Sequence, residues 1–106
     1  MPAYSISLPP ISNTPSSTSN ADLYTADADV SVLVGCCNIG TGAILVRIGI
    51  DPVAIALFWK VFDFSIAVGD SLPDLGPWAL QSGDKITVRT SVANDAVFSL
   101  TGYKSN

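Results

Sequence analysis

The sequence contains no histidine and no glutamate among its 106 residues. The lack of histidine excludes a histidine general base, a Ser–His–Asp triad and every metal site that needs an imidazole ligand. Charged residues are also scarce, at 13%, and nine aspartates against five basic residues give a net charge of −4. Because the basic residues are few and scattered, the chain is not expected to bind nucleic acid.

An uninterrupted apolar run of the kind that crosses a membrane is also missing. After the proline-rich first twenty-one residues, the longest stretch without a charge is seventeen residues between Asp29 and Arg47, which is at the short limit for a spanning helix. Turn-forming residues interrupt it between Asn38 and Gly42. No basic region follows Met1. We therefore predict neither a spanning helix nor a secretory signal, and no membrane partner.

Apolar residues, by contrast, are abundant for a chain of this length. They make up 48% of the sequence, and 106 residues are enough for one domain only. A small, lightly charged domain with this much apolar surface is more stable when other subunits cover part of it. We therefore expect the protein to work in contact with other protein chains.

The first twenty residues differ in composition from the rest. Four of the seven prolines lie within the first fifteen positions, which excludes a helix and disfavours a central strand. One interpretation is a disordered terminus. The interpretation that we adopt is an extended arm over residues 1–20 that lies across a neighbouring subunit. Its uncharged sequence offers apolar side chains at nearly alternate positions to fill pockets there: Tyr4, Ile6, Leu8 and Ile11.

Residues 21–106 have the pattern of an all-β domain. About a quarter of the chain is valine, isoleucine or threonine, and apolar residues alternate with small or polar ones. Turn signals recur about every ten residues, which is typical of a β-sandwich or small barrel. The predicted fold is a small antiparallel β-sandwich, jelly-roll or immunoglobulin-like. Its clearest strands are expected at residues 22–26, 30–37, 44–50, 86–90 and 98–102.

Three weaker segments carry specific expectations. Residues 53–58 are assigned to a strand rather than a helical turn, and a register change or bulge is expected between residues 59 and 66. After the turn at residues 68–72, Pro73 and Pro77 are expected to stop a short segment. A turn at Asn94-Asp95 is expected to close a hairpin onto the last strand.

Aspartates are the only candidate catalytic groups. Most of them stand beside turn residues, where side-chain hydrogen bonds to the backbone account for them. Asp27 and Asp29 lack the glutamate that ends a calcium loop. Cys36 and Cys37 are adjacent on a strand and cannot complete a zinc site, so we interpret them as small hydrophobic residues in a reduced compartment. We predict no enzymatic activity, no metal and no cofactor.

The aromatic residues allow two interpretations. Trp59, Trp78, Tyr24 and Tyr103 could form a sugar-stacking surface, as in carbohydrate-binding modules, or could fill a sandwich core and an oligomer seam. Trp78 follows Pro77, and we expect it to be exposed enough to anchor an interface, together with Tyr103.

The order of these features resembles that of small β-sandwich virion proteins of tailed bacteriophages. The resemblance covers about four-fifths of the chain. Each of its motifs consists of turn-forming residues and alternating apolar residues, so only the order of the motifs is specific to these proteins. The motifs are Asp22–Thr25, the strand from Val30 to Cys37 with Asn38 after it, Val68–Leu72, Leu80–Arg89 and Val97–Tyr103.

The resemblance implies a structural protein with no catalytic motif. Proteins of this kind include capsid decoration (cement) proteins, which commonly form homotrimers and reach across neighbouring subunits with N-terminal arms. The expected partners are therefore the major capsid protein and further copies of this chain, on the outer surface of a virion that is assembled in the bacterial cytoplasm. A neck, tail or fibre component is the alternative within the virion, and a carbohydrate-binding module is the alternative outside this class.

Overall fold

The computed structural model of the chain describes residues 4–105, and side chains from Ile6 onward. Over this range the chain forms nine strands and no helix, which confirms the all-β prediction. Every strand pairing is antiparallel. The strands are β1 (Tyr4–Ser7), β2 (Ile11–Asn13), β3 (Ala21–Thr25), β4 (Val30–Asn38), β5 (Ile44–Asp51), β6 (Phe58–Ile66), β7 (Ser71–Leu80), β8 (Lys85–Thr90) and β9 (Ala96–Ser105).

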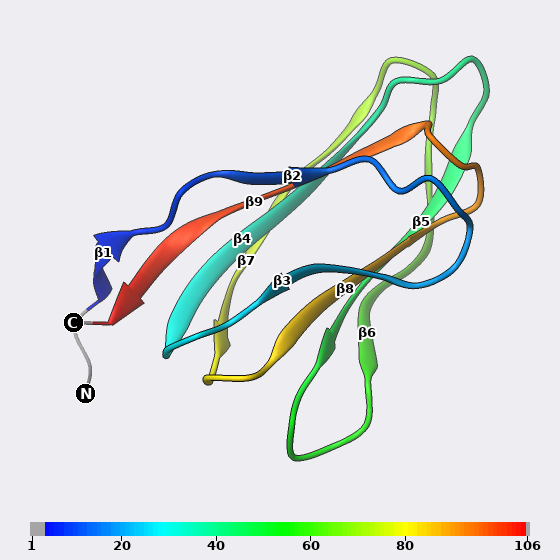
Figure 1. Cartoon of the computed structure of the whole chain (residues 1–106). Coiled ribbons are helices and arrows are strands. Elements are labelled where there is room, and N and C mark those ends of the chain that lie inside the picture. Colours follow the sequence, from blue (N-terminus) through cyan, green and yellow to red (C-terminus); the bar gives the residue numbers. More distant parts are fainter. Residues whose placement is uncertain (1–3, 106) are drawn as a thin grey trace.

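The strands form two sheets that pack face to face (Figure 1). Sheet A has the order β1-β9-β4-β7, and β2 pairs with the same edge of β9 as β1, further along that strand. Sheet B has the order β3-β8-β5-β6. This arrangement confirms the predicted antiparallel β-sandwich.

The strand order identifies the sandwich as a jelly roll. Among strands that follow one another in the sequence, only β5 and β6 pair with each other. Around this hairpin the pairs are nested, β4 with β7, β3 with β8, and β1 and β2 with β9. An immunoglobulin-like sandwich would instead pair several consecutive strands. The chain is thus one long antiparallel ribbon, folded so that its strands alternate between two sheets.

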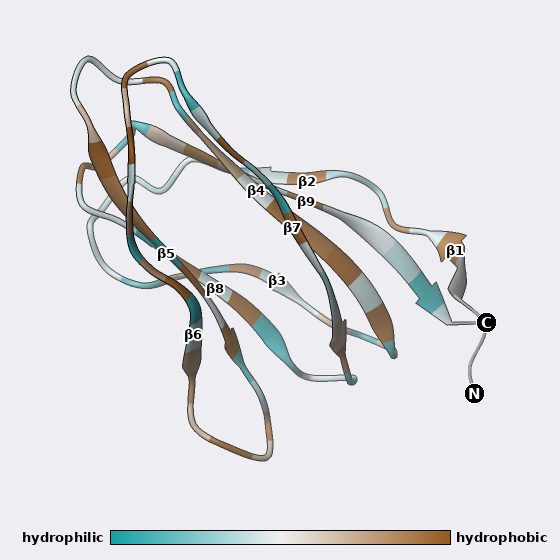
Figure 2. Cartoon of the chain, turned by 180° about the vertical axis from the view of Figure 1, so that it is seen from behind, coloured by the Kyte–Doolittle hydropathy of each residue, from teal (hydrophilic) through white to brown (hydrophobic). Residues whose placement is uncertain are grey.

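The core lies between the two sheets, where alternate residues of both meet. Strand β4 shows the pattern, because Val30, Val32 and Val34 are fully buried and the residues between them are partly exposed. Figure 2 shows hydrophobic bands on the strands of both sheets. Burying one such side chain stabilises the fold by roughly 1.5–3 kcal/mol. The largest fully buried apolar side chains are Phe98, Ile44, Ile48, Ile86 and Leu100.

Residues 4–13 lie along strand β9 of their own chain, whereas residues 1–20 were expected to form an arm across a neighbouring subunit. Strands β1 and β2 run end to end along β9, and Leu8 between them donates its backbone N–H to Gly102 at 2.8 Å. Leu8 is only 8% exposed and belongs to the core. The physical reason is that β9 has a free edge whose backbone groups need partners. Pro9 and Pro10, which lack the N–H, fall in the gap between the two short strands.

The prolines of β7 do not stop the strand, so the expectation of a short segment was wrong. Strand β7 runs through ten residues at the edge of sheet A. Its register against β4 shifts twice, and Pro73 and Pro77 both fall at these shifts, where no residue has to donate to β4. An edge strand with bulges therefore tolerates prolines that a central strand would reject.

Two further expectations were wrong, and one was confirmed. Strands β8 and β9 belong to different sheets, so the turn at Asn94-Asp95 crosses between sheets and closes no hairpin. Residues 53–57 form a bend in the loop of the β5–β6 hairpin, and the strand begins only at Phe58. The expected bulge in the following strand is present, because the register of β6 against β5 shifts around Ile48.

A buried asparagine fastens the loop that connects the two sheets after β4. Asn38 is 1% exposed, and its amide donates to the carbonyl oxygens of Gly42 at 2.8 Å and Ile66 at 3.0 Å. Its own carbonyl oxygen accepts the backbone N–H of Gly40 at 2.9 Å. These three bonds join the end of β4, the following loop and the end of β6, so the side chain replaces backbone pairing that the crossing loop cannot make.

Candidate interaction surfaces

Two of the residues predicted to bind a partner line one groove on the outer face of sheet A. Leu8 and Tyr103 border a hollow of about 500 Å³ together with Pro10, Leu33 and Pro77. We call this hollow the β9 groove. Tyr103 is 53% exposed, while Leu8 is held in place by its hydrogen bond to Gly102. The groove is mostly apolar, and Ser7, Ser31 and Thr101 are the polar residues that line it.

The remaining predicted residues lie elsewhere. Ile6 is 42% exposed but borders a different hollow, beside Lys104 and Tyr24. Ile11 and Trp78 are partly buried and pack against the core, so Trp78 is less exposed than the sequence suggested. The backbone of Tyr4 pairs with Ser105, and its side chain lies outside the described residues. The structure thus brings Leu8 and Tyr103 together at one groove, and Leu8 also borders the hollow beside Ile6.

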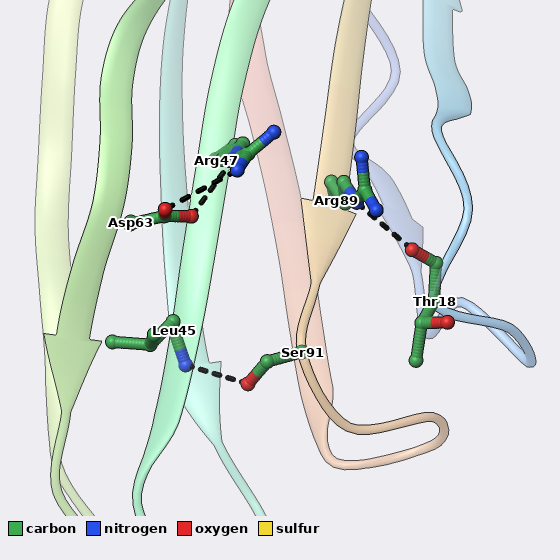
Figure 3. Close-up of polar contacts among 6 residues, drawn as sticks. All are labelled: Thr18, Leu45, Arg47, Asp63, Arg89 and Ser91. Atoms are coloured by element: carbon green, nitrogen blue, oxygen red, sulfur yellow. Dashed lines mark hydrogen bonds and ion pairs between the residues drawn. The ribbon is translucent and has the colours of Figure 1, made fainter.

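A second surface, which the sequence analysis did not predict, lies on the outer face of sheet B. Arg47 alternates with buried residues of β5 and points outward, where its Nε and Nη2 donate to the two carboxylate oxygens of Asp63 at 2.7 and 3.2 Å (Figure 3). Its guanidinium also stacks on Phe62, 4.0 Å from the ring centre, and lies 5.7 Å from the ring centre of Trp59. We call the surface formed by Leu45, Arg47, Trp59, Phe62, Asp63 and Arg89 the arginine face.

The local backbone explains why Asp63 meets Arg47. Asp63 has a φ of 51°, in the left-handed region that aspartate tolerates better than most residues, and it lies in the bulge of β6. The hydrogen bond from Arg47, together with the positive charges of Arg47 and Arg89, lowers the pKa of Asp63. The carboxylate therefore stays ionised, and Arg47 is held in a fixed orientation by two bonds.

Arg89 stands directly opposite Arg47 across the β5–β8 pair. Its Nε donates to the backbone oxygen of Thr18 at 3.0 Å, as Figure 3 shows. Thr18 lies in the segment that joins β2 to β3, so this bond ties that segment to sheet B. Nearby, the hydroxyl of Ser91 accepts the backbone N–H of Leu45 at 2.9 Å. A shallow hollow of about 250 Å³ lies between these side chains.

The buried Cys36 is not a reactive thiol. Cys36 is buried, and desolvation, with a smaller contribution from the neighbouring Cys37, raises the pKa of its thiol to about 12. A thiol with this pKa is protonated at neutral pH and is a poor nucleophile. Within residues 4–105, no three cysteine or aspartate side chains come together as a metal site, and no helix could span a membrane.

No family model, curated protein or solved structure matches the chain. We therefore base the functional proposal on the fold and on these two surfaces. The β9 groove has a volume of about 500 Å³ and the hollow at the arginine face about 250 Å³, and both surfaces combine apolar side chains with a few polar groups, as sites that bind other molecules do.

The sequence contains only a partial signal for the arginine face. Arg47 and Arg89, its two arginines, each interrupt a run of alternating apolar residues, which marks both as outward-facing. That they stand opposite each other depends on the pairing of β5 with β8, and their approach to Asp63 depends on a bulge. Neither the pairing nor the position of the bulge can be read from one sequence.

Proposed function

We propose that the protein is a structural component of a tailed-bacteriophage virion, a decoration (cement) protein. In this proposal it forms a homotrimer on the outer surface of the assembled head and binds the major capsid protein. The jelly roll supports the class of function, because this fold is frequent in viral capsid domains and in lectins, although a fold alone does not define a function.

The observation that supports the proposal is the presence of two candidate interaction surfaces on different sheets of one small domain. The β9 groove lies on the outer face of sheet A and the arginine face on the outer face of sheet B. A protein that joins subunits needs at least two such surfaces, so that one can hold the shell while the other holds a neighbour. A single-ligand binding domain needs only one.

We assign the β9 groove to the capsid protein. Its apolar walls and exposed Tyr103 resemble the anchor-and-pocket arrangement of protein interfaces, in which a few aromatic residues supply most of the binding energy. Binding only to the assembled shell would stabilise that shell by mass action, which is how a decoration protein would strengthen a head without any catalysis.

Binding of the purified protein to isolated heads of the phage that encodes it tests this proposal. Tyr103→Ser is expected to weaken co-sedimentation with heads at least about tenfold, the effect of removing one strong interface anchor. Ile39→Ser is the matched control, because Ile39 is 58% exposed but lies on a loop away from both surfaces. Deleting residues 1–20 would be a poor test, since it removes Leu8 from the core and uncovers β9.

The position of the protein in the particle distinguishes the two virion assignments. Electron cryo-microscopy of the phage should find many copies distributed over the head surface. A single ring at the neck or tail would replace decoration by the alternative assignment. Failure of the wild-type protein to bind heads, or unchanged binding of Tyr103→Ser, would contradict the proposed use of the β9 groove.

A further inference from the structure

The arginine face concentrates positive charge on an otherwise acidic protein. Arg47 and Arg89 are the only arginines of the chain, and they are direct partners across β5 and β8. Like charges in such a position destabilise a sheet. Asp63 compensates only one of them, because its carboxylate is bonded to Arg47. The face therefore carries a formal charge of +1, from two arginines and one aspartate.

The surroundings of the arginine pair are apolar and exposed. Phe62 is 60% exposed and Leu45 is 43% exposed, although both extend from regular strands of sheet B. Trp59 packs closely over Gly49, where a methyl group would come within 2.8 Å of the ring. Arginine with phenylalanine and tryptophan is the combination enriched at protein–protein interfaces. Binding of small ions alone would not require the exposed apolar side chains.

We infer the partner of the arginine face from the net charge of the rest of the chain. Apart from Asp63, the chain has eight aspartates, and apart from the two arginines it has three lysines, so the rest of the molecule has a formal charge of −5. The rest of a second copy therefore carries a net charge opposite to that of the arginine face of the first. Two arginine faces brought together would instead oppose four arginines with two aspartates.

We infer that the arginine face is the seam through which one copy binds a different, acidic surface of the next copy. This inference rests on the self-association that the proposed function requires. The contact is heterologous, and a heterologous contact that closes on itself produces a ring of copies. It does not extend sheet B strand to strand, because the bulge at Asp63 disrupts the exposed edge of β6.

Sedimentation velocity of the purified full chain over a range of concentrations and NaCl levels tests the inference. Phe62→Ser is expected to raise the dissociation constant of the oligomer at least about tenfold. Its matched control is Ile39→Ser, which removes a similarly exposed apolar residue from a loop away from both surfaces and should leave the constant unchanged. Arg89→Gln should weaken association and reduce its dependence on salt, whereas Lys104→Gln, with the same change of net charge, should do neither.

The outcomes separate this inference from the proposed function. A wild-type protein that stays monomeric at all concentrations overturns the inference, and so does an oligomer that survives both Phe62→Ser and Arg89→Gln. A monomer that binds glycans through Trp59 would assign the face to carbohydrate and overturn it as well. If the variants break the oligomer but the wild-type protein does not bind phage heads, the seam stands and the proposed function fails. Unchanged melting temperatures of the variants exclude unfolding as the cause.

Discussion

Replacing Asn38 with aspartate tests how much the buried asparagine contributes to the junction between the two sheets. The substitution preserves the shape of the side chain but replaces its amide, which donates to Gly42 at 2.8 Å and to Ile66 at 3.0 Å, by a carboxylate oxygen. The bond from the Gly40 N–H to the other oxygen can remain. Two hydrogen bonds are lost, and a negative charge faces two carbonyl oxygens inside the protein.

The magnitude follows from these contacts. Two lost hydrogen bonds cost about 1 kcal/mol each, and two unsatisfied buried carbonyls facing a charge add a similar or larger amount, so we expect a loss of roughly 4 kcal/mol. At about 2.1 cal/mol/K per residue, 106 residues unfold with an entropy of about 0.22 kcal/mol/K. The melting temperature should therefore fall by about 18 °C.

The loss should depend on pH with a defined sign. Burial beside carbonyl oxygens raises the pKa of the introduced carboxyl in the folded state above its unfolded value, so the penalty is largest at neutral pH and shrinks as pH falls through the folded pKa. Calorimetry and urea titration followed by tryptophan fluorescence at pH 7 and pH 4 measure both effects. Asn20→Asp is the control, because Asn20 is exposed and its side chain makes no hydrogen bond in the described structure. A loss below about 1 kcal/mol, or one that does not shrink in acid, would refute this account of Asn38.

Three further predictions follow from single observations. Thr87→Val should stabilise the protein by about 1 kcal/mol in calorimetry, because the buried Thr87 hydroxyl has no hydrogen-bond partner among the described residues; an unchanged stability would show that the hydroxyl is satisfied. At pH 8 a thiol reagent should modify Cys37 but not Cys36, whose pKa is raised to about 12 by burial, and both should react in urea; rapid reaction of both in buffer would contradict the burial of Cys36. Gly102→Ala should cost at least about 2 kcal/mol in urea titration, since its methyl group would overlap the backbone oxygen of Ser31, and a neutral effect would mean that β9 can move away from β4.

The sequence predicted the strands in which large apolar residues recur at alternate positions. The expected strands at residues 22–26, 30–37 and 44–50 are found at 21–25, 30–38 and 44–51. Such segments are predictable because one face of each is buried, and burial imposes a period of two on the apolar residues. Strand β7 was misjudged because its two prolines are accommodated by register shifts against β4, and nothing in the sequence marks these shifts.

The N-terminal segment shows the limit of composition as a guide. Its prolines and its alternating apolar residues correctly indicate an extended chain. They do not indicate whether this segment pairs with a sheet edge of its own subunit or of a neighbouring subunit. In the structure, Leu8 and Ile11 lie along β9 of the same subunit. The choice depends on the free edge of β9, which exists only once the sandwich has formed.

Composition and periodicity by themselves determined that the chain is an all-β sandwich, lacks imidazole chemistry and has more apolar residues than a small solvated domain needs. These properties are local or additive, so one sequence is enough to establish them. The nested strand order, the groove beside Tyr103, and the opposition of Arg47 and Arg89 were decided only by the tertiary structure. Each of them requires residues far apart in the chain to become neighbours, and pairing between distant strands is set by the packing of the whole molecule.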